Sequence, residues 1–249
     1  MKVSIFITCL GDQFFPEVGL SMVRVLRHLG CEVDFPEAQV CCGQPAFNTG
    51  YRDEARVVAG ALVDAFEASE YVVSPSGSCT AMIHHYYEEL FRGDPDRLLK
   101  ATRFRQKTHE FSQFLRHVLG VTQLPARFPE SVTYHASCHG SRLLGARNEP
   151  LELLNLVQGI ELRPLERCED CCGFGGTFSV KLSDLSAALT DEKVSHIAET
   201  RARYLVGTDM GCLMNIRGRM QRRHIDVEAL HLAQLLDRAL ANGASERGT

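Results

Sequence analysis

The chain has 249 residues, of which 45% are hydrophobic and 23% charged, and this composition is typical of a globular protein. Its formal net charge of −4 gives no general electrostatic attraction to nucleic acid. The apolar run in MKVSIFITCLGDQFFPE is too short for a spanning helix and lacks a signal cleavage site. No other stretch approaches the ~18 apolar residues of a membrane span, so we expect no transmembrane helix.

Short apolar runs alternate with helical patterns along the chain. In chain order we expect a strand in KVSIFITC (2–9), helices over 15–29 and 51–69, strands in EYVVS (70–74) and SVTYHASC (131–138), a helix ending at Gly159, a helix over 181–202 and a strand in RYLVG (203–207). Because strands alternate with helices, the sequence predicts an α/β fold with mainly parallel sheets flanked by helices.

Two segments in the middle of the chain set the expected domain boundary. Residues 94–120 have a helical pattern without a counterpart later in the sequence, so we interpret them as a helical insertion. Residues 121–130 contain two prolines and are interpreted as a linker. The sequence therefore predicts two domains, 1–125 and 126–249.

The ten cysteines follow a repeated pattern. Cys-Cys-Gly occurs at 41–43 and again at 171–173, and a distant single cysteine precedes and follows each copy. Matched cysteines lie 129, 130 and 133 residues apart: Cys9 and Cys138, Cys41 and Cys171, Cys79 and Cys212. Such spacing indicates an internal duplication, so we expect two similar halves related by a pseudo-twofold axis, with both cysteine sets near their interface.

Each cysteine set falls at the expected carboxyl ends of strands, the edge where α/β sheets bind ligands. Four thiolates suit an iron–sulfur cluster or zinc; zinc is the weaker alternative because structural zinc sites use two closely spaced pairs. Gly43 and Gly173 are expected to keep the backbone clear of a large inorganic ligand. The expected ligands are Cys9, Cys41, Cys42 and Cys79 in one site and Cys138, Cys171, Cys172 and Cys212 in the other.

These motifs resemble the cysteine-rich CCG domain that occurs twice in one of the subunits of heterodisulfide reductase and in the iron–sulfur subunit of glycolate oxidase. The strings LGCEVDFPEAQVCCGQPAFNTGY, SPSGSCTAMI and CCGFGGTFSVKLSDLS are more closely similar to the lactate utilization protein A family, over nearly the whole chain. The resemblance implies a cytoplasmic, cluster-bearing component of an L-lactate oxidation system. It also implies two partners, a ferredoxin-like lactate utilization protein B and a small lactate utilization protein C.

One departure from the wider CCG pattern concerns a fifth cysteine in each site. That pattern ends in Cys-x-x-Cys, but here Ser76 and Asp209 occupy the first position of the pair. Four cysteines remain in each site, which is enough for an ordinary [4Fe-4S] cluster, so we expect two clusters of this type rather than the non-cubane type.

Several residues beside the sites have two interpretations. His135 and His139 flank Cys138, and they either hydrogen-bond to cluster sulfur or transfer protons, or they are ordinary structural histidines. Cys31 is interpreted as a buried structural thiol. Cys168 lies three residues before the second Cys-Cys-Gly and is either a fifth ligand or a loop cysteine without a role.

The sequence identifies no catalytic residue and no flavin or nicotinamide site, so an enzymatic role of its own stays open. The leading interpretation is an iron–sulfur electron-transfer subunit for L-lactate oxidation, acting within a complex. One alternative is the corresponding subunit for glycolate or another 2-hydroxy acid. The other is a zinc-stabilised scaffold without redox function.

Overall fold

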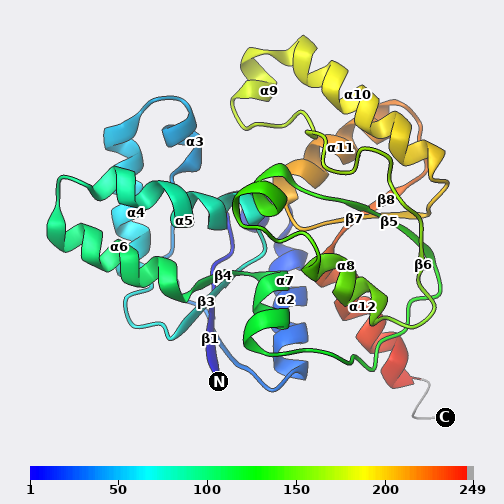
Figure 1. Ribbon diagram of the computed structural model, residues 1–249, viewed down its shortest axis with the longest axis horizontal. Coiled ribbons are helices and arrows are strands. Elements are labelled where there is room, and N and C mark those ends of the chain that lie inside the picture. The colour runs from blue at the N-terminus through cyan, green and yellow to red at the C-terminus, as the bar shows by residue number, and fades with distance from the viewer. Residues whose placement is uncertain (246–249) are drawn as a thin grey trace.

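The computed structural model describes residues 1–245. Within them, two four-stranded sheets lie side by side (Figure 1), and every strand pair is parallel. The strand orders are β2-β1-β3-β4 and β6-β5-β7-β8, so the two halves share one topology. The predicted fold, two copies of an α/β unit with parallel strands, is confirmed.

The first half contains the first sheet and its helices. Its strands are β1 (Lys2–Ile5), β2 (Glu32–Asp34), β3 (Tyr71–Ser74) and β4 (Thr108–Glu110). Its helices are α1 (Cys9–Phe14), α2 (Pro16–His28), α3 (Gln44–Asn48), α4 (Arg52–Ala65), α5 (Gly77–Phe91), α6 (Pro95–Lys107), α7 (Phe111–Gln113) and the π-helical turn η1 (Phe114–Val118).

The second half repeats this arrangement with one helix fewer between its last two strands. Its strands are β5 (Ser131–His135), β6 (Glu161–Leu162), β7 (Tyr204–Gly207) and β8 (Glu228–His231). Its helices are η2 (His139–Leu143), α8 (Glu149–Asn155), α9 (Phe178–Lys181), α10 (Ser183–Glu199), α11 (Met210–Arg222) and α12 (Leu232–Ser245).

Apolar spacing explains how the helices cover the sheets. In α2, Val18, Met22, Val25 and Leu26 recur at helical spacing and are buried, and Pro16 at the first position has the φ that a first turn needs. The short strands β1 and β3 are buried on both faces, as is usual for parallel strands between two helical layers.

The segment 94–120 is not the purely helical insertion that the sequence predicted. Thr108 and His109 continue from α6 into the strand β4, which ends at Glu110 and pairs with β3 in parallel. The strand was missed because its residues are polar, although Thr108 and Glu110 are fully buried. The Thr108 hydroxyl donates to the carbonyl of Phe104, and Glu110 caps α7 through one carboxylate oxygen, while its other oxygen has no hydrogen-bond partner in the described chain. Because β4 corresponds to β8, only α6 lacks a counterpart.

A single core cluster joins the two halves. Val3 of β1 and Met22 of α2 belong to the same cluster as Val132 of β5 and Leu235 of α12. Residues 121–130, which connect η1 to β5, hold no helix or strand, only an isolated bridge from Arg127 to Gln158. The shared core means that the halves are repeats rather than separately packed bodies, and the boundary near residue 125 stays a prediction.

Each half places its last helix against the other half. The helix α12 lies along α2 (Figure 1), where Asp237 accepts hydrogen bonds from Ser21 at 2.9 Å and from Arg24 at 2.6 Å. In the pseudo-symmetric contact, α7 and η1 lie against α8, and Arg116 pairs with Glu152 at 2.7 Å. The two reciprocal contacts hold the carboxyl ends of the sheets toward a common centre. Among residues 1–245, none of the helices has the length and apolar character to cross a membrane.

Candidate metal centres

All eight cysteines of the two predicted sets lie beyond the carboxyl ends of strands. The single cysteines follow β1, β3, β5 and β7 directly, where the chain turns into a helix, and the adjacent pairs lie in the loops after β2 and β6. Cys79 and Cys212 are the third residues of α5 and α11, so each lies in the first turn of a long helix. All ten cysteines of the chain are free thiols.

The first set is compact. The sulfurs of Cys9 and Cys41 lie 3.4 Å apart, and those of Cys42 and Cys79 lie 3.2 Å apart. Hydrogen bonds from the Cys42 and Cys9 thiols lower the pKa of Cys41, while hydrogen bonding to Cys41 raises the pKa of Cys9. The Tyr87 hydroxyl donates to the carbonyl of Cys42 at 3.0 Å and fixes the loop. The structure thus gathers the four thiols that the sequence predicted.

The second set repeats this electrostatic pattern. Hydrogen bonds from the Cys138 and Cys172 thiols lower the pKa of Cys171, and the amide of Gly173 also donates to its sulfur at 3.3 Å. Contact with Cys171 and burial raise the pKa of Cys138. Cys172 and Cys212 are buried. In both halves, therefore, hydrogen bonds from neighbouring thiols lower the pKa of the first cysteine of the adjacent pair.

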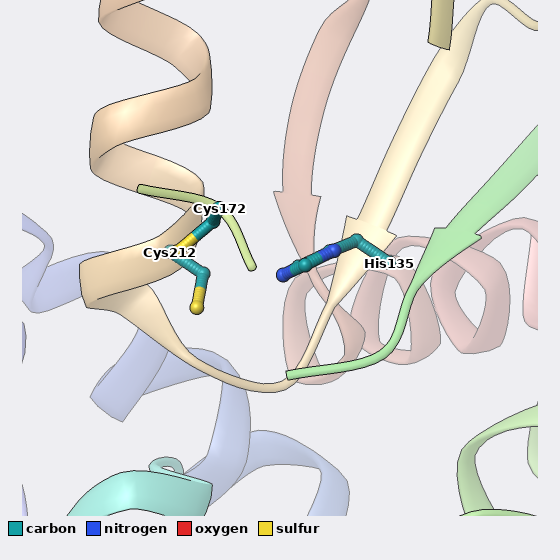
Figure 2. Close-up of side chains that lie close together, drawn as sticks. All are labelled: His135, Cys172 and Cys212. Atoms are coloured by element: carbon teal, nitrogen blue, oxygen red, sulfur yellow. The ribbon is translucent and has the colours of Figure 1, made fainter. Parts of the chain in front are cut away.

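His135 is the histidine that the structure places against a cysteine set. It ends β5, is 1% exposed, and its ring points toward Cys172 and Cys212 (Figure 2); the ligand atoms of the three residues all lie within 4.8 Å of one another. Neither ring nitrogen has a partner in hydrogen-bond geometry within the described chain, and the nearby backbone of Cys168 only weakly favours the protonated ring. Burial lowers the pKa of His135 to about 4. His139 is half-buried and lines the same pocket as most of the predicted cysteines.

Glycine follows each cysteine pair because the backbone and a helix require it. Gly43 and Gly173 have φ of +82° and +80°, in the left-handed region that favours glycine. A Cβ at Gly43 would lie 3.1 Å from the carbonyl oxygen of Ala55, and one at Gly173 would lie 2.6 Å from that of Ser186. A side chain would therefore meet α4 or α10, which is a different reason from the crowding of an inorganic ligand that the sequence suggested.

Ser76 and Asp209 cap helices and connect the two halves. The Ser76 hydroxyl accepts from the amide of Cys79, and Asp209 accepts from the amide of Gly211. Across the interface, Asp209 also accepts from the Ser76 hydroxyl at 3.1 Å and from the amide of Ser78 at 2.8 Å. The positions where the wider CCG pattern has a cysteine thus hold a buried hydrogen-bonded junction.

The two cysteine sets open into one pocket of about 460 Å³ between the halves. Its walls include seven of the eight predicted cysteines: Cys9, Cys42, Cys79, Cys138, Cys171, Cys172 and Cys212. Its other walls are hydroxyl, amide and apolar side chains and the imidazole of His139, and Asp209 is the acidic residue among those lining it in the described chain. The convergence of both sets on one pocket agrees with the expected placement near the interface.

The remaining cysteines lie outside the two sets. Cys31 is 6% exposed in the shared core, as expected for a structural thiol. Cys168 is half-buried, and its carbonyl accepts from the ammonium of Lys193 at 3.2 Å. Lys193 is itself 1% exposed, and its burial was not predicted, because a lysine on an amphipathic helix is usually a surface residue.

Comparison with known proteins identifies the family. The model of the cysteine-rich CCG domain matches residues 3–84 and 132–217. Lactate utilization protein A 2 of Bacillus cereus (strain Q1) is 51% identical over 241 residues, covering 97% of this chain and 100% of the relative. Lactate utilization protein A 1 of Bacillus mycoides (strain KBAB4) is 50% identical over 237 residues, covering 95% and 97%.

Among solved structures, glutamate racemase from Francisella tularensis in complex with D-glutamate matches 99% of this chain and 82% of the racemase chain. The sequence identity is 11% and the TM-score is 0.35, so this likeness is too weak to bear on fold or function. The two matches to the CCG model coincide with the two halves of the fold, and the relatives extend over nearly the full length. The chain therefore belongs to the lactate utilization protein A family.

Proposed function

We propose that this chain is the iron–sulfur electron-transfer component of an L-lactate oxidation system in the cytoplasm. The observation that carries the proposal is the gathering of two equivalent sets of four thiols at strand ends, opening into one pocket. The name of its relatives, lactate utilization protein A, supports the choice of substrate.

The donor sets fit iron–sulfur clusters. Thiolate is the ligand that such clusters use, and each site supplies four. In each site neighbouring thiols lower the pKa of one cysteine, and thiolate is the form that the cationic core of a cluster requires. Bound clusters would supply one-electron transfer. The first would be held by Cys9, Cys41, Cys42 and Cys79, and the second by Cys138, Cys171, Cys172 and Cys212.

The lining of the shared pocket favours electron transfer over direct binding of lactate. Lactate is a carboxylate, which proteins commonly bind through arginine or lysine. Neither residue type is among those lining the pocket in the described chain, and Asp209 adds a carboxylate of its own. We propose that a partner binds the substrate, and that the partners are the ferredoxin-like lactate utilization protein B and lactate utilization protein C.

Anaerobic purification followed by iron, sulfide and zinc analysis tests the proposal. About eight irons and eight sulfides per chain are expected for two four-iron clusters. Zinc in stoichiometric amount, or protein without iron after anaerobic reconstitution, would refute it and support the scaffold alternative. With the partners present, L-lactate should reduce the iron, as seen by electron paramagnetic resonance; reduction by glycolate but not by lactate would change the substrate.

A further inference from the structure

The two cysteine sites differ at matched positions along their first strands. Ile5 pairs with Val73 in β1–β3, and Tyr134 pairs with Val206 in the equivalent β5–β7, so the next residues, Phe6 and His135, correspond. Both are fully or almost fully buried. The first site therefore has an apolar ring where the second has an imidazole aimed at two of its thiols.

A second difference lies on the helix behind each cysteine pair. Because Gly43 faces Ala55 and Gly173 faces Ser186, α4 and α10 can be aligned at these contacts. The same alignment matches Val63 with Val194, and it places Lys193 at the position of Leu62. Leu62 is a fully buried core residue of the first half. One buried leucine in the first site thus corresponds to a buried lysine in the second.

The ammonium of Lys193 is held beside the second site by backbone carbonyls. It donates to the carbonyls of Arg167 at 2.6 Å and Cys168 at 3.2 Å, and within the described chain it forms no ion pair with a carboxylate. Burial lowers the pKa of Lys193, while Asp170 and the nearby sulfurs of Cys168, Cys172 and Cys212 act to raise it. Carbonyl oxygens hold an ammonium without neutralising it, so its field extends to the site.

His135 has hydrogen-bonding capacity that the protein alone leaves unused. A neutral imidazole has one N–H donor and one acceptor nitrogen, and here both are buried without a partner in hydrogen-bond geometry, although the Cys168 backbone lies near enough to raise the pKa of the ring. Buried polar atoms in proteins are nearly always paired, so an unpaired ring directed at Cys172 and Cys212 indicates a partner at that site. The first site has no equivalent donor, because Phe6 occupies the position.

We propose that His135 and Lys193 give the second cysteine site the higher reduction potential of the two, so that the sites are unequal electron carriers. This inference rests on the proposed function. Reduction adds negative charge to a cluster, and a nearby hydrogen-bond donor or positive charge stabilises the reduced form. The first site, surrounded by Phe6 and Leu62, lacks both effects. An electron shared between the sites then resides mainly on the second.

Redox titration of the anaerobically reconstituted protein, followed by electron paramagnetic resonance, tests the inference. Cys172→Ser leaves the first site and Cys42→Ser leaves the second, so the two single-site forms assign the potentials. The Cys42→Ser form should have the higher midpoint potential. His135→Phe and Lys193→Leu introduce the residues of the first half, and each should lower the midpoint potential of the second site. The double variant should bring that potential close to the potential of the first site.

A matched control separates a local effect from a general loss of charge. Lys107 is also held by carbonyl oxygens, those of Phe66, Glu67 and Ser69, but it lies at the opposite ends of the strands. Lys107→Leu should leave the second-site potential unchanged. Iron and sulfide counts accompany each titration, because a variant that merely unfolds loses its clusters rather than shifting a potential.

The outcomes distinguish the inference from the function on which it rests. Protein that binds no iron refutes both. Two clusters with equal potentials in the single-site forms, or a first site with the higher potential, overturn the inference alone. A second-site potential that does not change in His135→Phe and Lys193→Leu, with full iron content, also overturns it.

Discussion

Asp209→Ala is the substitution that most directly tests the junction between the halves. Asp209 is 5% exposed and accepts three hydrogen bonds: from the amide of Gly211 at 3.1 Å, from the amide of Ser78 at 2.8 Å and from the hydroxyl of Ser76 at 3.1 Å. Alanine removes the acceptor and leaves two backbone donors unpaired, the buried amide of Gly211 and the partly buried amide of Ser78. The Ser76 hydroxyl keeps other partners, because it also contacts Ser78 and accepts from the amide of Cys79.

The expected cost follows from these contacts. Each buried donor left without a partner costs about 1–3 kcal/mol, so the loss of two bonds in Asp209→Ala should lower the free energy of unfolding by about 2–6 kcal/mol. Asp94 provides the matched control, since it caps α6 through the amide of Arg97 but is exposed and bonds to no other element. Asp94→Ala should cost about 1 kcal/mol, the ordinary value of a helix cap.

Urea unfolding followed by circular dichroism, under anaerobic reducing conditions, measures both variants. Equal losses for Asp209→Ala and Asp94→Ala would refute the reasoning, because the bonds across the interface would then contribute nothing. Iron per chain should remain close to that of the unchanged protein wherever Asp209→Ala stays folded. A loss of one cluster from folded protein would instead show that the carboxylate is a ligand.

Three further predictions concern the cysteines, a glycine and a buried acid. Cys42→Ser and Cys172→Ser should each halve the iron per chain after anaerobic reconstitution; full iron in either variant would contradict the ligand sets. Gly173→Ala should cost about 2 kcal/mol or more in urea unfolding, because φ is +80° and a Cβ would lie 2.6 Å from the carbonyl oxygen of Ser186; a cost near zero would show that the loop relaxes. Burial raises the pKa of Glu110 from 4.5 to about 7, so the folded chain binds more protons in that interval and loses stability as pH rises through it. Relative to Glu110→Gln, the unchanged protein should lose up to about 3 kcal/mol between pH 4.5 and 7, and parallel pH profiles of the two would disprove the shift.

Local patterns in the sequence were sufficient to predict the architecture. The β-branched runs ending at Cys9 and Cys138 predicted strands whose carboxyl ends carry thiols, and the structure has them there. The repeated spacing predicted two similar halves, and both sheets have the same strand order. These features depend on the identity and spacing of nearby residues, which a sequence shows directly.

Features that depend on tertiary contacts were not predictable. β4 consists of polar residues whose burial is decided by the adjacent strand and by α7. Lys193 lies on a helix with an apolar face, and only the carbonyls of a distant loop explain why it is buried. The reciprocal contacts of Ser76 and Asp209 join residues 133 positions apart, so the sequence showed a missing cysteine but not its replacement.

The last helix of each half packs against the opposite half, and these two contacts can form only in a fixed order during translation. Arg116 and Glu152 are only 36 positions apart, so η1 can meet α8 early in translation. Ser21 and Asp237 are 216 positions apart, and at about 5–20 residues per second α2 waits roughly 10–40 s for α12. Since α12 follows every other helix of the described chain, the apolar face of α2 is covered only after α12 has been made, and the pocket between the halves takes its final form after that.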